Sequence, residues 1–194
     1  CTLFTPGCNF RCPFCHNASL VDGSADTFVS EAELFSFLSR RKGILDGVCI
    51  TGGEPTLQKD IIPFMEKIRE MGFLLKLDTN GSFPEKLIHL VESGLVDKVA
   101  VDIKNSPESY GKTVGIENYD LTPVLKTVEY LKADHVDYEF RTTVDTLCTS
   151  HISVFVTADL TVDNHNLVGR TFSVAGQDQN HCRQQYQRDN DNCY

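Results

Sequence analysis

The chain has 194 residues, 41% of them hydrophobic, which is enough for one domain with a sizeable core. It carries 18 Lys and Arg against 27 Asp and Glu, for a formal net charge of -9. This acidic balance argues against a general affinity for nucleic acid or an anionic membrane, because both favour clustered Lys and Arg.

The chain contains no apolar run of about 18 residues and no basic, then apolar, leader, so we predict a soluble cytoplasmic protein. Its 8 cysteines are too few for a disulfide-stabilised scaffold, in which cysteine exceeds roughly 8% of residues. We therefore expect reduced thiols and a metal. The chain starts at Cys1 inside a predicted strand, and we expect further residues to precede it.

Apolar runs and helical patterns alternate along the first three quarters of the chain. Strands are predicted at Cys1–Phe4, Val48–Thr51, Phe73–Asp78, Lys98–Ile103 and Tyr138–Val144. Helices are predicted at Glu31–Arg41, Ile61–Met71, Pro84–Ser93 and Leu121–Lys132, with Ser30 as a cap and Gly72 as a terminator. This order predicts an α/β fold whose parallel sheet forms a partial (β/α) barrel.

The pattern changes after Val144. The segment Ile152–Val162 alternates like a strand but no helix follows, and residues 177–194 contain no Ala, Val, Ile, Leu, Met or Phe. We predict a core at residues 1–144, a divergent segment at 145–176 and a disordered tail at 177–194.

Cys8, Cys12 and Cys15 follow the first predicted strand with the spacing CxxxCxxC. Three thiolates can hold a [4Fe-4S] cluster while leaving the fourth iron without a protein ligand. An open iron indicates chemistry on a small molecule, and S-adenosylmethionine is the obvious candidate. The alternative is a structural zinc site formed by these cysteines and His16, although His16 directly adjoins Cys15 and is awkwardly placed to join the same metal.

Polar motifs follow the next strands, and the carboxyl ends of parallel strands are where ligands collect. Gly52 and Gly53 allow close backbone approach, and Glu54 supplies a carboxylate for an ammonium group. The alternative is that Gly52, Gly53 and Glu54 form an ordinary turn. Because all these motifs follow parallel strands, we expect them to converge in space.

Asp78 and Asn80 follow the third predicted strand, and Asp102 and Lys104 follow the fourth. Their side chains suit hydrogen bonding to the amino, carboxylate and ribose groups of a cofactor, with turn and cap chemistry as the alternative for Asp and Asn.

Arg141 lies on one face of the last predicted strand with Glu139 and Thr143. A charged strand face inside a barrel points at a ligand. The alternatives are a solvated edge or a pairing of Glu139 with Arg141.

The strings LFTPGCNFRCPFCHN, ITGGEPTLQ, KLDTNG, VDIK and DYEFRTTV, in this order, resemble those of radical S-adenosylmethionine enzymes, and closely resemble anaerobic ribonucleoside-triphosphate reductase activating proteins. The resemblance runs from Cys1 to about Val144. It implies the radical SAM type of partial barrel, with Cys8, Cys12 and Cys15 as cluster ligands and Phe14 beside the adenine.

The resemblance also implies roles for the other motifs. Gly52, Gly53 and Glu54 would hold the methionine amino group, and the four residues at Asp78, Asn80, Asp102 and Lys104 would contact the methionine and ribose. Arg141 would lie near the carboxylate or the substrate loop, and with Lys104 and the three cysteines it completes the expected catalytic set.

The implied reaction is one-electron cleavage of S-adenosylmethionine, followed by hydrogen abstraction from a glycine of a separate glycyl radical enzyme. The implied partners are an anaerobic ribonucleoside-triphosphate reductase and a flavodoxin or ferredoxin-type reductant, with no nucleic acid and no membrane. Two alternatives stay open: a radical enzyme acting on a small molecule, similar to 7-carboxy-7-deazaguanine synthase, and an inactive cluster-binding fragment.

Departures from the family pattern begin after Val144, where the expected further βα units are missing from the sequence. A truncated or frame-shifted product would explain this. Cys148, Cys182 and Cys193 would be the residues of an auxiliary cluster, but their spacing is irregular.

Overall fold

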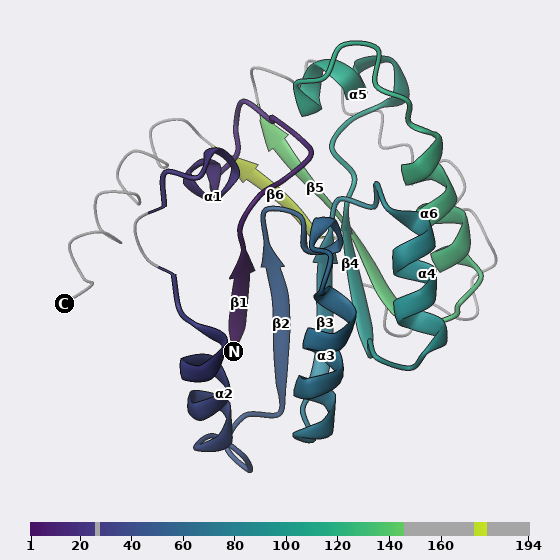
Figure 1. Ribbon diagram of the computed structural model, residues 1–194. Helices are drawn as coiled ribbons and strands as arrows, with labels where there is room; N and C mark the ends of the chain where they lie inside the picture. Colours follow the sequence, from purple (N-terminus) through teal and green to yellow (C-terminus); the bar gives the residue numbers. More distant parts are fainter. Residues whose placement is uncertain (26–27, 146–172, 178–194) are drawn as a thin grey trace.

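A computed structural model describes residues 1–25, 28–145 and 173–177 (Figure 1). The strands are β1 (Thr2–Thr5), β2 (Gly47–Gly52), β3 (Leu74–Thr79), β4 (Lys98–Asp102), β5 (Asp137–Asp145) and β6 (Ser173–Gln177). The helices are α1 (Ala18–Asp22), α2 (Glu31–Ser39), the 3-10 turn η1 (Pro55–Leu57), α3 (Ile61–Glu70), α4 (Pro84–Glu92), α5 (Pro107–Val114) and α6 (Thr122–Lys132).

The six strands form one parallel sheet in the order β1-β2-β3-β4-β5-β6. Each strand therefore adds to the same edge of the sheet in chain order. Because parallel crossovers are right-handed, this order brings the connecting helices to one face, and α3, α4 and α6 lie along that face in Figure 1. The predicted α/β fold with a partial (β/α) barrel is confirmed.

The helix-covered face of the sheet is apolar. Its buried side chains alternate along the strands and belong to one core with residues of α3, α4 and α6. They are Val48 and Ile50 on β2, Leu75 and Leu77 on β3, Val99 and Val101 on β4, and Tyr138 and Phe140 on β5. Burial of each such side chain contributes about 1.5 to 3 kcal/mol to folding. The opposite, concave face carries polar and charged residues.

Helix boundaries follow local chemistry. The Ser30 hydroxyl accepts a hydrogen bond from the backbone N–H of Glu33, and the Glu33 carboxylate accepts one from the backbone N–H of Ser30, so the predicted cap of α2 is confirmed. Gly72, with φ of 92°, follows Met71, the C-cap residue of α3, as expected.

The sequence prediction missed four elements, namely α1, η1, α5 and β6. The first three are short, and β6 covers the end of the segment predicted to be divergent together with Gln177, the first residue of the tail predicted to be disordered. The predicted strand at Ile152–Val162, the rest of the predicted tail at 178–194 and the three late cysteines lie outside the described residues. No helix in the described part of the chain combines the length and apolar character needed to cross a bilayer.

Candidate active site

A cavity of about 810 Å³ opens at the carboxyl ends of the strands, on the concave side of the sheet. Its walls come from the loops after β1, β2, β3 and β4 and from β5. The lining includes Cys8, Cys12, Phe14, Cys15, Gly52, Gly53, Asp78, Asn80, Asp102, Lys104 and Arg141. The expected convergence of the motifs is therefore present, and Glu54 is the one predicted site residue that does not line the cavity.

The cysteine loop follows β1, and all three of its thiols are half-buried. Burial raises the pKa of Cys12 to about 11, and the nearby Lys104 ammonium partly offsets this rise. Burial likewise raises the pKa of Cys8, whose sulfur accepts a hydrogen bond from the backbone N–H of Phe10 at 3.3 Å. A cation and N–H donors beside the thiols favour the thiolate form that binds iron.

Aromatic side chains from a later part of the chain pack against this loop. Phe10 is 2% exposed and meets Tyr119 and Tyr110 edge to face, with ring centroids 5.2 and 6.5 Å apart. The backbone N–H of Arg11 donates to the carbonyl of Val114 at 2.8 Å. The loop is thus held by the segment from α5 to Tyr119, which the sequence prediction did not include.

Gly52 and Gly53 are required by the chain that leads into the cysteine loop. A Cβ on Gly52 would lie 2.3 Å from the nitrogen of Thr5, and a Cβ on Gly53 would lie 1.9 Å from the carbonyl oxygen of Gly7. The N–H of Gly53 donates to the carbonyl of Thr5, and the N–H of Glu54 donates to that of Gly7, both at 2.8 Å. The two loops are therefore joined along their backbones.

The Glu54 carboxylate has different partners from those predicted. It is fully buried and accepts hydrogen bonds from the N–H and hydroxyl of Thr56, from the Thr79 hydroxyl at 2.7 Å and from the Asn80 N–H at 2.7 Å. Burial raises the pKa of this carboxyl, and the four donors partly offset the rise. Glu54 therefore ties the loop after β2 to the end of β3, and its oxygens do not face the cavity.

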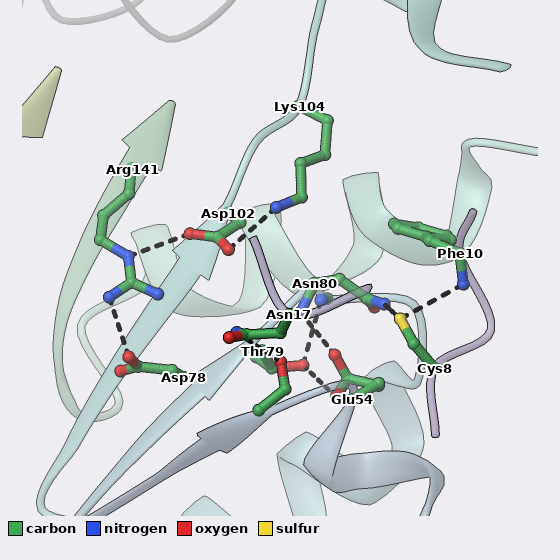
Figure 2. A network of polar contacts seen from close by, with 12 residues as sticks. Cys8, Phe10, Asn17, Glu54, Asp78, Thr79, Asn80, Asp102, Lys104 and Arg141 are labelled. Carbon is green, nitrogen blue, oxygen red and sulfur yellow. Dashed lines mark hydrogen bonds and ion pairs between the residues drawn. The ribbon is translucent and has the colours of Figure 1, made fainter. Parts of the chain in front are cut away.

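Asn80 connects this buried carboxylate to the cysteine loop. Its side-chain oxygen accepts hydrogen bonds from the N–H of Ser82 at 2.9 Å and from the Ser82 hydroxyl at 2.5 Å. The amide nitrogen consequently points the other way, to the side-chain oxygen of Asn9 at 2.9 Å and to the sulfur of Cys8 at 3.9 Å (Figure 2).

The charged residues predicted at the strand ends form one continuous set of ion pairs (Figure 2). Arg141 donates to Asp78 at 2.9 Å and to Asp102 at 3.0 Å, and Asp102 also binds Lys104 at 3.0 Å. Burial alone would raise the pKa of Asp102, but Lys104 and Arg141 lower it below its usual value. Arg141 is paired with these two aspartates, so the alternative pairing with Glu139 is not formed.

Lys76 is a cavity residue that the sequence prediction missed. It comes two positions before Asp78 on β3 and binds Asp78 at 2.7 Å and Glu139 at 3.2 Å. The signal was present in the sequence, because Lys76 and Asp78 alternate with buried Leu75 and Leu77, and a period of two places them on the opposite face.

The donor set fits a cluster bound by three thiolates, since Cys8, Cys12 and Cys15 line one cavity beside N–H donors and a cation. In the described ranges, no three His, Cys, Asp or Glu side chains are close enough together to hold a single metal ion, and this applies to the three cysteines with or without His16.

Known proteins similar to this chain include ones named as glycyl-radical enzyme activating enzymes, as 7-carboxy-7-deazaguanine synthase and as GTP 3',8-cyclases. A protein of Methanocaldococcus jannaschii named "putative glycyl-radical enzyme activating enzyme" is 35% identical over 145 residues, which is 73% of this chain and 59% of that protein. The 7-carboxy-7-deazaguanine synthase of Koribacter versatilis is 32% identical over 136 residues, 69% of this chain and 56% of that enzyme. The chain thus spans less than two thirds of these relatives.

The fold has a counterpart in the solved structure of anSMEcpe with bound AdoMet, with a TM-score of 0.66 and 19% identity over 90% of this chain and 51% of that one. The family model that describes the radical SAM superfamily matches residues 2–148. Enzymes of this superfamily use a [4Fe-4S] cluster and S-adenosylmethionine, the two cofactors predicted from the sequence. The matched residues include every motif that meets at the cavity, and the chain belongs to the radical SAM superfamily.

Proposed function

We propose that the chain is a radical SAM activating enzyme that generates a glycyl radical on an anaerobic ribonucleoside-triphosphate reductase. One observation carries the proposal: the cysteine loop and the Gly52–Gly53 loop line one cavity, in a chain whose 35% identical relative is named for glycyl-radical enzyme activation. Because the chain spans 59% of that relative, the proposal concerns the part of the enzyme that these residues form.

Cys8, Cys12 and Cys15 are the proposed cluster ligands, and Lys104 is the cation that offsets their buried negative charge. When bound, the reduced cluster and S-adenosylmethionine supply one-electron cleavage of the cofactor and an adenosyl group that takes a hydrogen atom. The chain itself supplies position and a water-poor pocket. A flavodoxin or ferredoxin-type protein is the proposed electron donor.

The cofactor is held, in this proposal, by backbone and by the strand-end charges. Gly52 and Gly53 line the cavity with their backbone, whose carbonyl oxygens suit the methionine ammonium. Asp78, Asp102 and Arg141 offer both signs of charge to a zwitterionic amino acid. Phe14, Asn80 and Lys104 complete the pocket for the adenine and ribose. Glu54 acts indirectly, by holding Asn80.

The cations that line the cavity are already paired with carboxylates or backbone carbonyls. The lining includes Arg11, Lys76, Lys104 and Arg141; Arg11 donates to backbone carbonyls and the other three bind carboxylates. Arg141 and Lys104 use only some of their N–H donors in these ion pairs, so both can also bind the carboxylate of the methionine group.

The small-molecule alternative rests on the 32% identity to 7-carboxy-7-deazaguanine synthase. A single experiment separates it from the proposal. The protein is reconstituted anaerobically with iron and sulfide and reduced with dithionite in the presence of S-adenosylmethionine and the anaerobic reductase from the same genome. Liquid chromatography measures 5'-deoxyadenosine, and electron paramagnetic resonance measures a glycyl radical on the reductase.

The expected result is both signals from the wild type and neither from Cys12→Ala, with Cys1→Ala as the control that keeps its cluster. Cys1 precedes β1 and is not among the residues that line the cavity. Deoxyadenosine without a protein radical would overturn the reductase assignment alone. A loaded cluster that forms no deoxyadenosine would overturn the enzyme proposal and indicate an inactive fragment.

A further inference from the structure

Eight charged side chains alternate in sign across the concave face of β3, β4 and β5 and the loop after β4. Each carboxylate in the middle of the series uses one oxygen for each neighbour. In order, the series is Asp137, Lys98, Glu139, Lys76, Asp78, Arg141, Asp102 and Lys104, with N···O distances from 2.7 Å for Lys76 and Asp78 to 3.7 Å for Lys98 and Glu139. We call this series the ion-pair chain.

Lys76 is the link between the two halves of the ion-pair chain. Its ammonium binds the Oδ1 atom of Asp78 at 2.7 Å and the Oε1 atom of Glu139 at 3.2 Å. The Oδ2 atom of Asp78 then binds Arg141 at 2.9 Å. Asp78 and Glu139 are 11% and 14% exposed, so each pair is largely shielded from water. Burial would lower the pKa of Lys76, but its bonds to Asp78 and Glu139 raise it, and the ammonium stays charged.

We infer that Lys76 is a positioning residue for cofactor binding: it fixes Asp78, and Asp78 in turn fixes the guanidinium of Arg141 at the cavity. Among the described residues, Asp78 pairs with two side chains of opposite charge, one on each oxygen. Without Lys76, one oxygen loses its charged partner and the carboxylate is held less firmly. Arg141 then keeps Asp102 but loses the fixed second contact that sets its plane.

Lys76 acts through Asp78 because two of its three donors are engaged with Asp78 and Glu139, and Asp78 lines the cavity beside Arg141. This inference rests on the proposed function only in requiring that S-adenosylmethionine binds at the cavity. It does not depend on which partner protein receives the radical. Nothing in the ion-pair chain touches the cysteine thiols except through Lys104, so cluster loading serves as an independent check.

The test is equilibrium dialysis of S-adenosylmethionine with the cluster-loaded protein and its Lys76→Met variant. We expect Lys76→Met to weaken binding on the order of tenfold, the size typical of coupling between contacting charged residues. The cofactor concentration for half-maximal deoxyadenosine formation should rise equally, while the maximal rate stays within about twofold. Lys67→Met is the matched control, because Lys67 pairs with Glu31 on the surface at 3.1 Å.

A double-mutant cycle with Asp78→Asn decides how Lys76 acts. If Lys76 works through Asp78, the double variant binds the cofactor as weakly as Asp78→Asn alone. Additive losses would overturn the inference and make Lys76 a direct contact. Unchanged binding by Lys76→Met, with the wild type binding normally, would overturn it as well, whereas no binding by the wild type would overturn the proposed function together with it.

A folding defect is controlled by a second, charge-balanced variant, Lys76→Met with Glu139→Gln. In this variant Lys98 keeps Asp137 and Asp78 keeps Arg141, so no buried carboxylate of the ion-pair chain is left without a partner. Because Asp78 has still lost Lys76, we expect the same weakening of binding as in the single variant. Normal binding by a folded, cluster-loaded double variant would contradict the inference.

Discussion

The side-chain amide of Asn80 donates a hydrogen bond to the sulfur of Cys8 across 3.9 Å, and thereby joins the end of β3 to the cysteine loop. The direction of this amide is fixed by Ser82, which donates twice to the Asn80 oxygen. Asn80 is itself held by Glu54 through its backbone N–H. One buried carboxylate thus controls a donor to the sulfur of a proposed cluster ligand.

We predict that Asn80→Ala shifts the midpoint potential of the bound cluster to a more negative value. Hydrogen bonds to cluster sulfurs stabilise the reduced, more negatively charged state, and this change removes one of the two donors found at Cys8. A redox titration followed by electron paramagnetic resonance measures the shift. An equal potential in the two proteins would show that this donor does not act on the cluster.

Gly53→Ala is predicted to disrupt the joined loops. The new Cβ would lie 1.9 Å from the Gly7 carbonyl oxygen, a distance that real atoms cannot adopt, so the loop after β2 must move away from the cysteine loop. We expect loss of measurable S-adenosylmethionine binding by equilibrium dialysis. Gly43→Ala is the comparison, because a Cβ there meets nothing within 4 Å and only the φ of 77° is unfavourable. Full binding by Gly53→Ala would refute the predicted clash.

Glu54→Gln should lower the free energy of unfolding by about 1 to 3 kcal/mol, because an amide nitrogen replaces one of two oxygens that only accept hydrogen bonds. Thr56, Thr79 and Asn80 all donate to this group. Denaturant unfolding of the anaerobic protein measures the change. The control is Glu85→Gln, whose side chain is 74% exposed and pairs with Lys126, and which should change stability by less than about 0.5 kcal/mol.

Asp97 supplies a pH-dependent contribution to stability away from the cavity. Burial would raise its pKa, but the hydrogen bonds from Arg69 at 2.6 and 3.0 Å and from the N–H of Leu75 at 2.7 Å lower it below the ordinary 3.8. A lowered pKa means that the folded state favours the ionised form. The contribution is therefore complete above pH 3.8 and declines as the pH falls below it.

We expect Asp97→Asn to cost about 1 to 2 kcal/mol at neutral pH. The difference from the wild type should narrow as the pH falls below 3.8, because both side chains are then uncharged. Urea unfolding at a series of pH values checks this. A difference that stays constant into the acid range would mean that the charge of Asp97 is not what stabilises the fold.

The strands could be predicted because the periodicity of apolar residues determines them. The convergence of the motifs at one cavity could be predicted because parallel strands end at the same edge of the sheet. Leu75 and Leu77 alternate with Lys76 and Asp78, and this pattern alone separates the core face from the concave face. The partners of Glu54 could not be predicted, since a carboxylate beside two glycines is equally compatible with a ligand and with donors 25 residues away. Only the packing of β2 beside β3 brings the donors of Thr79 and Asn80 to Glu54.

Lys76 and α5 were missed for different reasons. A single Lys in an apolar strand is a weak pattern, and its pairing with Glu139 joins residues 63 positions apart, which no local rule reveals. The helix α5 has eight residues, among them Gly111 and β-branched Thr113 and Val114, so its helical propensity is low. Its position depends on Tyr110 packing against Phe10.

The packing of Phe10 on Tyr110 and Tyr119 also sets an order of events during synthesis. The cysteine loop leaves the ribosome about one hundred residues before the aromatic side chains that pack against it. Until residues 107–119 have emerged, Phe10 has no buried site and the N–H of Arg11 has no Val114 carbonyl to bind. The loop therefore acquires its packed position only after residues 107–119 and the first four strands of the sheet have been made.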